Sequence, residues 1–382
     1  QTLLTCPNHH HRSQILLITA SHLFHHPCCC LSSSIANIMV TPQITIQTLE
    51  GPESLLADLS SFSQLTAGTE FDSYEDPQWR FLLSGQDIIA HVAQTNSRDE
   101  DRVDVNIPQT TPTSFAGCVL RVKIDDDDDD ETIGYGMVIV SPSQRKKGVA
   151  TTLLKRALGM EQMRNNHGRC VLAVCSELGQ PVYRNLGFRE AGVISMMACK
   201  VSDIRKCNLP KNDALNCNAQ PGHELDSKQK GWLFDLDRRA TGFCRRKRIN
   251  LLLKGYSEGC SCTVVFALSS NCGSDAYPQG VAIGRQDFFG GPFIIGPIIG
   301  SEECCLPMLR ELIHCHFDFT SDSSNDIGVT FMVSNHMKLV ENLLGVFNMA
   351  RLWEFPSMSL DGESVYRNGD GSYLVMMHPT LG

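Results

Sequence analysis

A basic, glycine-containing loop at residues 144–151 is the part of this sequence that points most directly to chemistry. Its sequence is QRKKGVAT, and the apolar residues after it recur at helical spacing, so the loop leads into a helix N-terminus. The first N–H groups of a helix lack intrahelical acceptors and carry the positive end of its dipole. Gly148 lets the backbone approach a ligand closely, and Arg145, Lys146 and Lys147 raise the positive potential. The loop therefore predicts a site for an anion such as a diphosphate.

The elements that must position this loop follow one another as strand, loop, helix, strand, short helix and strand. IGYGMVIV at 133–140 and RCVLAVCS at 169–176 are continuous apolar runs, typical of buried strands. A short helix is expected near 180–186, and a strand at 189–201 follows it. Strands and helices that alternate in this way indicate an α/β fold.

Two motifs of this segment together resemble the GNAT superfamily of N-acetyltransferases. VSPSQRKKGVATTLL resembles that superfamily's coenzyme-binding pattern, which is a strand, Arg/Gln-x-x-Gly-x-Gly/Ala and a helix. PVYRNLGF at 181–188 resembles its Tyr-x-x-x-Gly-Phe motif, although ELGQ at 177–180 lacks the Asn that many members carry there. The resemblance is strong over these motifs and extends over the rest of 42–201 in element order only.

The resemblance implies a mixed, strongly twisted sheet flanked by helices, in which two neighbouring strands splay apart and admit acetyl-CoA as co-substrate. It implies that the backbone of Val138, Ile139 and Val140 pairs with the pantetheine amides. It also implies that the pyrophosphate is bound by the loop and the helix start, at Arg145, Lys146, Lys147, Gly148, Val149, Ala150 and Thr151.

The same resemblance implies transfer of an acetyl group to a primary amine by direct attack on the thioester. Tyr183 is the candidate general acid for the leaving thiolate, and Glu177, just beyond a strand, is the candidate base or water-holder. The amine stays open between a small molecule and a protein. The alternative is a non-catalytic module that senses acyl-CoA, but coenzyme binding alone would not need Tyr183.

The chain of 382 residues suggests two domains. Residues 1–41 are expected to be unstructured or a leader, and organellar targeting stays open. Residues 42–201 are expected to form the acetyltransferase domain, with a disordered acidic loop near 94–131 and a hairpin at 79–93. Polar residues 202–230 are expected to be a linker before the second domain at 231–382.

The second half repeats the strand and helix order and resembles the smaller, degenerate GNAT-like domain that follows the first in some two-domain acetyltransferases. The match rests on Ile295-Gly296-Pro297 before a helix and on the segment 342–362. The residues IGSEE at 299–303 put acidic side chains where a diphosphate would bind, so a non-catalytic domain is expected. A basic helix at 231–254 is interpreted as a solvated face or a contact with the first domain, with RNA binding as the weaker hypothesis.

Composition excludes several classes of protein. The aspartate run at 125–130 supplies six of the nine net negative charges, so a nucleic-acid partner is not indicated. The 17 cysteines form no CxxC pair, which argues against a metal site and favours reduced thiols in the cytoplasm. No apolar run reaches the roughly 18 residues needed to span a membrane. The oligomeric state stays open.

Overall fold

A computed structural model describes most of the chain. The described residues are 44–66, 69, 76–84, 88–95, 115–124, 132–159, 169–172, 175–206, 214–254, 262–270, 276–286, 293–317, 328–334, 337–347, 349–362 and 373–375. The expected leader at 1–41 and the aspartate run at 125–130 lie outside these residues. None of the helices in the described ranges is long and apolar enough to cross a membrane.

The N-terminal half, residues 44–206, holds six strands and six α-helices among its described residues. In chain order these are β1 (Ile44–Glu50), α1 (Pro52–Ala57), α2 (Leu59–Thr66), α3 (Asp76–Leu83), β2 (Ile88–Thr95), β3 (Phe115–Lys123), β4 (Thr132–Val140), the 3-10 turn η1 (Pro142–Gln144), α4 (Val149–Leu158), β5 (Arg169–Leu172), α5 (Gln180–Asn185), β6 (Arg189–Lys200) and α6 (Val201–Lys206).

The C-terminal half, residues 214–375, has a similar alternation of strands and helices. Its described elements are β7 (Leu215–Pro221), the 3-10 turn η2 (Gly222–Glu224), α7 (Ser227–Thr241), α8 (Arg246–Lys254), β8 (Cys262–Ser269), β9 (Gly280–Gln286), β10 (Phe293–Ile299), α9 (Glu302–His316), β11 (Gly328–Ser334), α10 (Met337–Phe347), β12 (Ala350–Ser359) and β13 (Tyr373–Val375).

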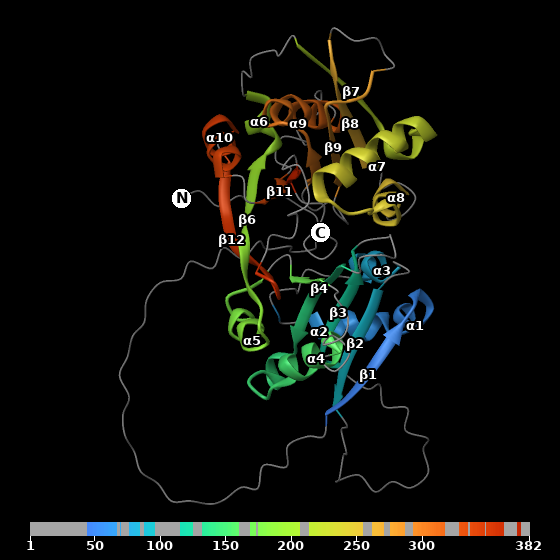
Figure 1. The fold of residues 1–382 in the computed structure, drawn as a ribbon, viewed down its shortest axis with the longest axis vertical. Helices are drawn as coiled ribbons and strands as arrows, with labels where there is room; N and C mark the ends of the chain where they lie inside the picture. The colour runs from blue at the N-terminus through green and yellow to red at the C-terminus, as the bar shows by residue number, and fades with distance from the viewer. Residues whose placement is uncertain are drawn as a thin grey trace, which may run out of the picture.

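All of these strands join one mixed sheet with the order β1-β2-β3-β4-β5-β12-β6-β11-β13-β10-β9-β8-β7. Strand β12 of the C-terminal half therefore lies between β5 and β6 of the N-terminal half, and β6 pairs on its other edge with β11. In Figure 1, β6 and β12 run side by side along the left edge and connect the lower and upper parts of the molecule. The two halves consequently share strands.

Helices cover both faces of the sheet in each half, which confirms the expected α/β class. In the N-terminal half α4 packs on β2, β3 and β4, whereas α2 contacts β3 and β4 from the helical layer of α1 to α3. In the C-terminal half α9 packs on β7, β8 and β9, and α7 contacts β9 and β10. One buried apolar cluster includes side chains of α1 to α3 together with side chains of α7 and α8, so the two halves share a core.

The expected disordered loop near 94–131 contains strand β3, which pairs with β2 and β4. Two further sequence-based expectations within this fold were also wrong. Residues 79–83, expected as a hairpin strand, belong to helix α3, in which Trp79, Leu82 and Leu83 lie buried at helical spacing. The expected linker at 202–230 contains β7, which pairs with β8 from Leu215 to Pro221. Strand β7 is an edge strand whose alternate residues are polar, and this composition made it resemble a linker.

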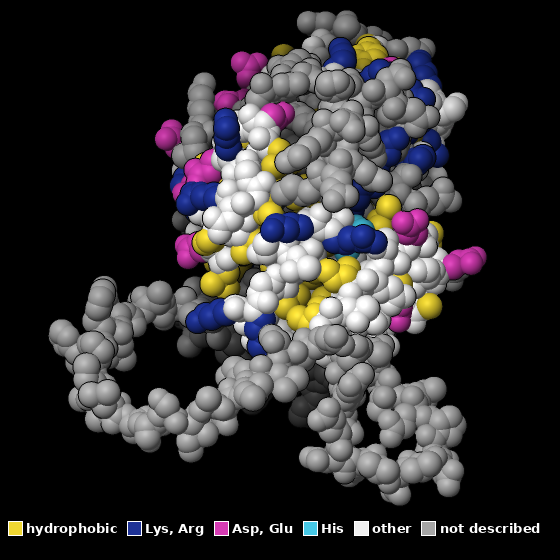
Figure 2. All heavy atoms as spheres, turned by 60° about the horizontal axis from the view of Figure 1, so that its bottom comes forward, with side chains coloured by type: hydrophobic (Ala, Val, Ile, Leu, Met, Phe, Trp, Pro, Cys, Tyr) yellow, Lys and Arg dark blue, Asp and Glu magenta, His cyan; other side chains and the backbone are white. Residues whose placement is uncertain are grey.

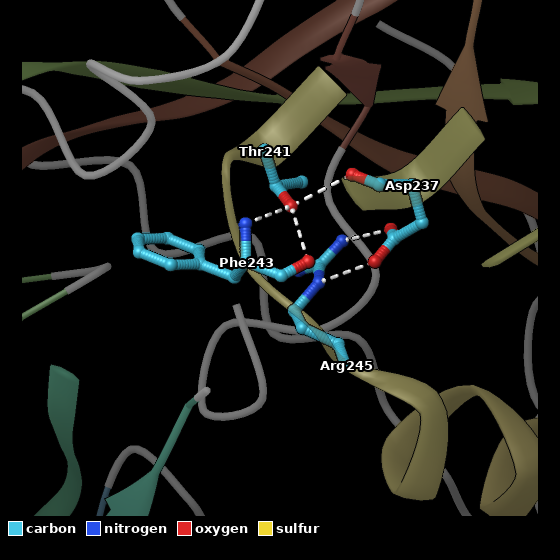
Figure 3. A network of polar contacts seen from close by, with 4 residues as sticks. All are labelled: Asp237, Thr241, Phe243 and Arg245. Atoms are coloured by element: carbon cyan, nitrogen blue, oxygen red, sulfur yellow. Dashed lines mark hydrogen bonds and ion pairs between the residues drawn. The ribbon is translucent and has the colours of Figure 1, made fainter. Parts of the chain in front are cut away.

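The expected basic helix at 231–254 is two helices, α7 and α8, separated at Gly242 in the left-handed conformation. Figure 3 shows the network at this corner, where the Arg245 guanidinium is buried and donates to Asp237 at 2.5 and 3.0 Å. The Thr241 hydroxyl donates to the Asp237 carbonyl at 2.7 Å and accepts from the Phe243 N–H at 3.1 Å. Arg245 thus forms a buried ion pair with Asp237 and does not belong to a solvated basic face.

A second basic residue of α8 connects the halves. The guanidinium of Arg248 is buried and donates to the backbone carbonyl of Lys123 at the end of β3. This bond agrees with the interpretation of the basic segment as a contact with the first domain. It leaves the remaining exposed basic side chains, such as Arg246 and Lys247, on the surface.

Candidate active site

Strands β4 and β5 diverge after a short stretch of parallel pairing, as the family resemblance implies. The pairing runs from Thr132 to Gly134, opposite 169–171, and β4 continues for six further residues. Strand β5 then follows β12 instead, because Leu172 pairs with Met358 and the Cys175 N–H donates to the Pro356 carbonyl at 3.1 Å. We call the opening between β4 and β5 beyond Gly134 the N-terminal splay.

A bulge in β4 lies at the start of this opening. The register of β4 against β3 shifts between Gly136 and Ile139, and Met137 between them has a φ of 50°. A positive φ is costly for a residue with a side chain and is found where the surrounding structure imposes it. Bulges bend a strand and re-aim its backbone groups. Here the bend turns the following residues of β4 away from β5.

The predicted pantetheine-binding residues follow the bulge. On one edge of β4, Ile139 pairs with Cys118 and Val140 with Gly117. On the other edge, no strand among the described residues pairs with β4 beyond Gly134. The Val140 carbonyl accepts a bond of 3.2 Å from Arg145 Nε, so this carbonyl already has a donor. The free edge at 138–140 suits a ligand with amide groups.

The predicted diphosphate loop has the backbone geometry of an anion site. Lys146 has a φ of 61° and Gly148, the N-cap of α4, has a φ of 78° with no side chain capping the helix. Successive backbone N–H groups in a turn can form a concave nest that binds anions. The N–H groups of Val149, Ala150 and Thr151 begin the helix and have no intrahelical acceptor. The start of α4 thus offers uncapped N–H groups at three of the predicted positions, and diphosphate binding by the loop stays a prediction.

Side chains around the loop add positive charge without closing it. Lys146 is exposed, and Lys147 Nζ donates to Gln144 Oε1 at 3.1 Å on the surface. A Cβ added at Gly148 would meet no atom within 4 Å, so its outer side is open. Figure 2, which turns the bottom of Figure 1 forward, shows Lys and Arg spread over this face and acidic side chains mainly toward its rim.

Tyr183, the predicted general acid, is a buried residue of the short helix α5. Its ring packs edge to face with Phe188 at a centroid distance of 6.2 Å. It belongs to the buried cluster that also holds Val149 and Leu153 of α4, and Val138 and Val140 of β4 pack against that cluster. Helix α5, α4 and the free edge of β4 are thus in one packing unit around the splay.

Gly179, the N-cap of α5, is a site residue that the sequence analysis did not identify. A Cβ at this position would lie 2.6 Å from Cε2 and 3.2 Å from the hydroxyl of Tyr183. Because glycine at position 179 has no Cβ, the Tyr183 ring can lie against its backbone. The nearby Glu177 is exposed in the preceding turn and makes no hydrogen bond or ion pair with the described residues. The structure shows no hydrogen bond between Glu177 and Tyr183, and the role of Glu177 as a base stays a prediction.

Two further titratable groups are unsuited to the chemistry of the splay. Burial raises the pKa of Cys175, at the end of the splayed strand, to about 12, so this thiol stays protonated and is a poor nucleophile. Burial, followed by the charges of Arg156 and Arg121, lowers the pKa of His91 in β2 to about 4. His91 Nδ1 is hydrogen-bonded to Thr48 Oγ1 at 3.0 Å, two strands away from β4. No group of three or more His, Cys, Asp or Glu within the described part of the chain could hold a metal ion.

Comparisons with known proteins agree with this geometry. Residues 113–190, which include the splay, the loop and Tyr183, match the family model of the acetyltransferase (GNAT) domain. A search of curated proteins gave no match. Among solved structures, a candidate acetyltransferase from Pyrococcus horikoshii is similar, with 12% identity, a TM-score of 0.59 and coverage of 92% of this chain and 99% of that one.

A tandem GNAT protein from the clavulanic acid biosynthesis pathway is similar over 83% of this chain and 98% of its own, with 10% identity and a TM-score of 0.57. The glucosamine N-acetyltransferase region of a fungal multi-domain β-N-acetylglucosaminidase gives 9% identity and a TM-score of 0.55 over 84% of this chain and 38% of that one. At such identities these likenesses concern the fold. Residues 113–190 therefore match the GNAT domain family, in a chain whose fold is similar to that of tandem GNAT proteins.

Proposed function

We propose that this protein transfers an acetyl group from acetyl-CoA to a primary amine in the N-terminal splay. The observation that carries the proposal is the junction of three features in one packing unit: a free strand edge, an uncapped helix N-terminus and a buried tyrosine. A diphosphate, a chain of amides and a thioester are the parts of acetyl-CoA that these features suit. The acceptor, a small molecule or a protein amine, is left to experiment.

The coenzyme would be bound mainly by backbone groups. The N–H groups at the start of α4 would donate hydrogen bonds to the pyrophosphate oxygens, aided by the helix dipole. The free edge of Val138, Ile139 and Val140 would pair with the pantetheine amides in the manner of an added strand. This arrangement would place the thioester near the bulge at Met137, where β4 turns away from β5.

In the reaction, the neutral amine nitrogen attacks the thioester carbonyl carbon and the carbon–sulfur bond breaks. The electron pair of that bond leaves with sulfur, and the thiolate takes a proton from the Tyr183 hydroxyl. Before the attack, the incoming ammonium loses a proton to Glu177, directly or through water, and after it the proton released by the new amide nitrogen returns to the Tyr183 phenolate. The products are an N-acetylated amine and the free thiol of coenzyme A. Most of the rate acceleration would come from holding amine and thioester in attack geometry.

Replacement of Tyr183 by phenylalanine tests the assigned acid. Release of free thiol from acetyl-CoA is measured against a panel of amines, for Tyr183→Phe and for the control Tyr135→Phe. Tyr183→Phe is expected to lower kcat by roughly 100- to 10,000-fold, the usual contribution of a general acid, with little change in acetyl-CoA affinity. Tyr135 is a buried tyrosine of β4 whose hydroxyl donates to the Ala157 carbonyl at 3.3 Å, so its loss should affect stability and not kcat.

The same assay distinguishes the transferase from the alternative, a non-catalytic acyl-CoA sensor. A sensor would show stabilisation by acetyl-CoA without thiol release for any amine of the panel. An unchanged kcat in Tyr183→Phe would be compatible with a transferase, but it would show that Tyr183 is not its general acid. Glu177→Gln separates the base: if Glu177 accepts the proton, the variant should lose activity most at low pH, where less of the amine is neutral.

A further inference from the structure

The C-terminal half repeats the divergence of parallel strands. Strand β10 pairs in parallel with β11 from Phe293 to Ile295, and its register against β9 then shifts between Ile295 and Ile298. Strand β11 continues along β6 up to Ser334. These features match the parallel pairing, the bulge and the divergence of β4 and β5. We call the opening beyond Ile295 the C-terminal splay.

A strand of the same chain lies in this second opening. Val375 of β13 pairs with Ile298 of β10 and also with Val333 of β11, and Tyr373 pairs with Ile299. Strand β13 therefore lies between the two diverging strands, antiparallel to both. In the sheet order β13 lies between β11 and β10, whereas no described strand lies between β5 and β4.

The surroundings of the C-terminal splay suit a peptide better than a coenzyme. Ile295, Ile298 and Ile299 of β10 are buried, and helix α7 contacts β13. Only Gly300 and Ser301 separate β10 from α9, so no loop can surround a diphosphate. The first turn of α9 carries Glu302 and Glu303, whose charge opposes a phosphate.

We propose that the C-terminal splay is a strand-binding site for an extended apolar peptide, and that residues 373–375 are its occupant in cis. Paired backbone groups on both edges supply the affinity, because unpaired buried N–H and C=O groups are costly. The site binds an extended peptide with apolar side chains and does not bind acyl-CoA. The inference is independent of whether the N-terminal splay is catalytic.

Hydrogen exchange on the intact chain tests the occupancy directly. The amides of the segment 373–375 are expected to exchange at least about 100-fold more slowly than in a free peptide of the same sequence, because the segment pairs with β10 and, at Val375, also with β11. Exchange at the rate of the free peptide would overturn the proposal.

A peptide added in trans tests the specificity of the site. In the full-length variant Val375→Pro, residue 375 loses its N–H and β13 should leave the splay, whereas Val375→Ala keeps the backbone donor. A fluorescein-labelled peptide with the sequence GSYLVMMH, residues 371–378, should bind Val375→Pro in a 1:1 complex and bind neither Val375→Ala nor the unaltered chain. Equal binding to all three proteins, no binding to Val375→Pro, or a second equivalent of acetyl-CoA bound by Val375→Pro would each contradict it.

Discussion

Both halves of the molecule contain a pair of parallel strands that diverge. The two openings differ in what lies in them and in the loop beside them. In the N-terminal half, eight residues between Val140 and Val149 form a basic loop ahead of α4, and no described strand lies in the splay. In the C-terminal half, two residues connect β10 to α9, the helix starts with two glutamates and β13 lies in the splay. The difference is in the loop and the occupant, and the framework is shared.

Matching glycines show how closely the framework is shared. A Cβ at Gly117 of β3 would lie 2.8 Å from the Ile139 carbonyl, and one at Gly280 of β9 would lie 2.8 Å from the Ile299 carbonyl. Both would also press on side chains of the helix that follows, α4 in one case and α9 in the other. The sheet and helix therefore approach equally closely in both halves. We infer that ligand choice is set by the connection between strand and helix.

The largest effect on acetyl-CoA affinity is expected when an acidic residue, as found in the first turn of α9, is introduced into the first turn of α4. Ala150 is the second residue of α4 and Glu303 the second of α9, so Ala150→Glu transfers the acidic position. A charge pair about 4 Å apart at the protein surface is worth about 1–4 kcal/mol. We expect acetyl-CoA affinity, measured by calorimetric titration, to fall about 100-fold in Ala150→Glu.

The isosteric variant Ala150→Gln is the matched control, because it adds the same bulk without the charge. Its affinity should fall far less than that of Ala150→Glu. An acidic residue in the first turn stabilises a helix by about 0.3–1 kcal/mol, so Ala150→Glu should not lower the free energy of unfolding. Equal losses of affinity in the two variants would show that crowding, and not charge, distinguishes the two helix starts.

A smaller effect is expected at Gly179, because no glycine among the described residues of the C-terminal half has a tyrosine within 4 Å of its Cβ position. Gly179→Ala places a methyl group against the Tyr183 ring, and overpacking of this kind costs about 1–3 kcal/mol or displaces the ring. We expect kcat for thiol release to fall about 10-fold, with the KM for acetyl-CoA nearly unchanged, since a general acid gains about 100-fold or more when it is correctly placed.

Gly231→Ala provides the comparison for this substitution. Gly231 lies in helix α7, and a Cβ there would meet no atom within 4 Å. The alanine variant should be more stable by about 0.5–1 kcal/mol and unchanged in kcat. If Gly179→Ala also leaves kcat unchanged, the position of the Tyr183 ring does not control turnover.

The smallest expected effect concerns two histidines, one in each half. Burial and the charges of Arg156 and Arg121 lower the pKa of His91 to about 4, whereas burial alone lowers the pKa of His316. The unfolded chain takes up a proton near pH 6.5 and the folded chain only near pH 4, so His91 makes folding less favourable as the pH falls through this window. The contribution is at most about 3 kcal/mol.

Urea denaturation between pH 4 and pH 7.5 measures this contribution. His91→Gln should lose less stability on acidification than the unaltered protein, and His316→Gln should differ less from it. The reverse order would mean that the positive charges of the N-terminal half do not act on His91.

Local patterns in the sequence predicted the elements beside the N-terminal splay, whereas the splay itself was implied by the family resemblance. A continuous apolar run, a basic loop with Gly148 and a helical repeat specify β4, the loop and α4 through short-range preferences. The aromatic run at 79–83 was assigned to a strand because apolar residues alone do not separate a short strand from a helix. The Asp76-Pro77 pair was the overlooked signal, since proline is favoured in the first turn of a helix.

Long-range pairing was not predictable from those patterns. Nothing local to 350–359 indicates that β12 inserts between β5 and β6, because the pairing depends on contacts with residues more than 150 positions away. The same holds for β13, which has three residues and two partner strands. The acidic start of α9 predicts that the second half lacks a diphosphate site, and this stays a prediction, whereas the strand between β10 and β11 was visible only in the structure.

The stoichiometry of acetyl-CoA binding tests the central claim most directly. Calorimetric titration of the intact protein should give one equivalent of acetyl-CoA per chain, and Ala150→Glu should remove that equivalent at the same concentrations. Two equivalents per chain would contradict the assignment of different occupants to the two splays. One equivalent that survives unchanged in Ala150→Glu would contradict the assignment of the site to the start of α4.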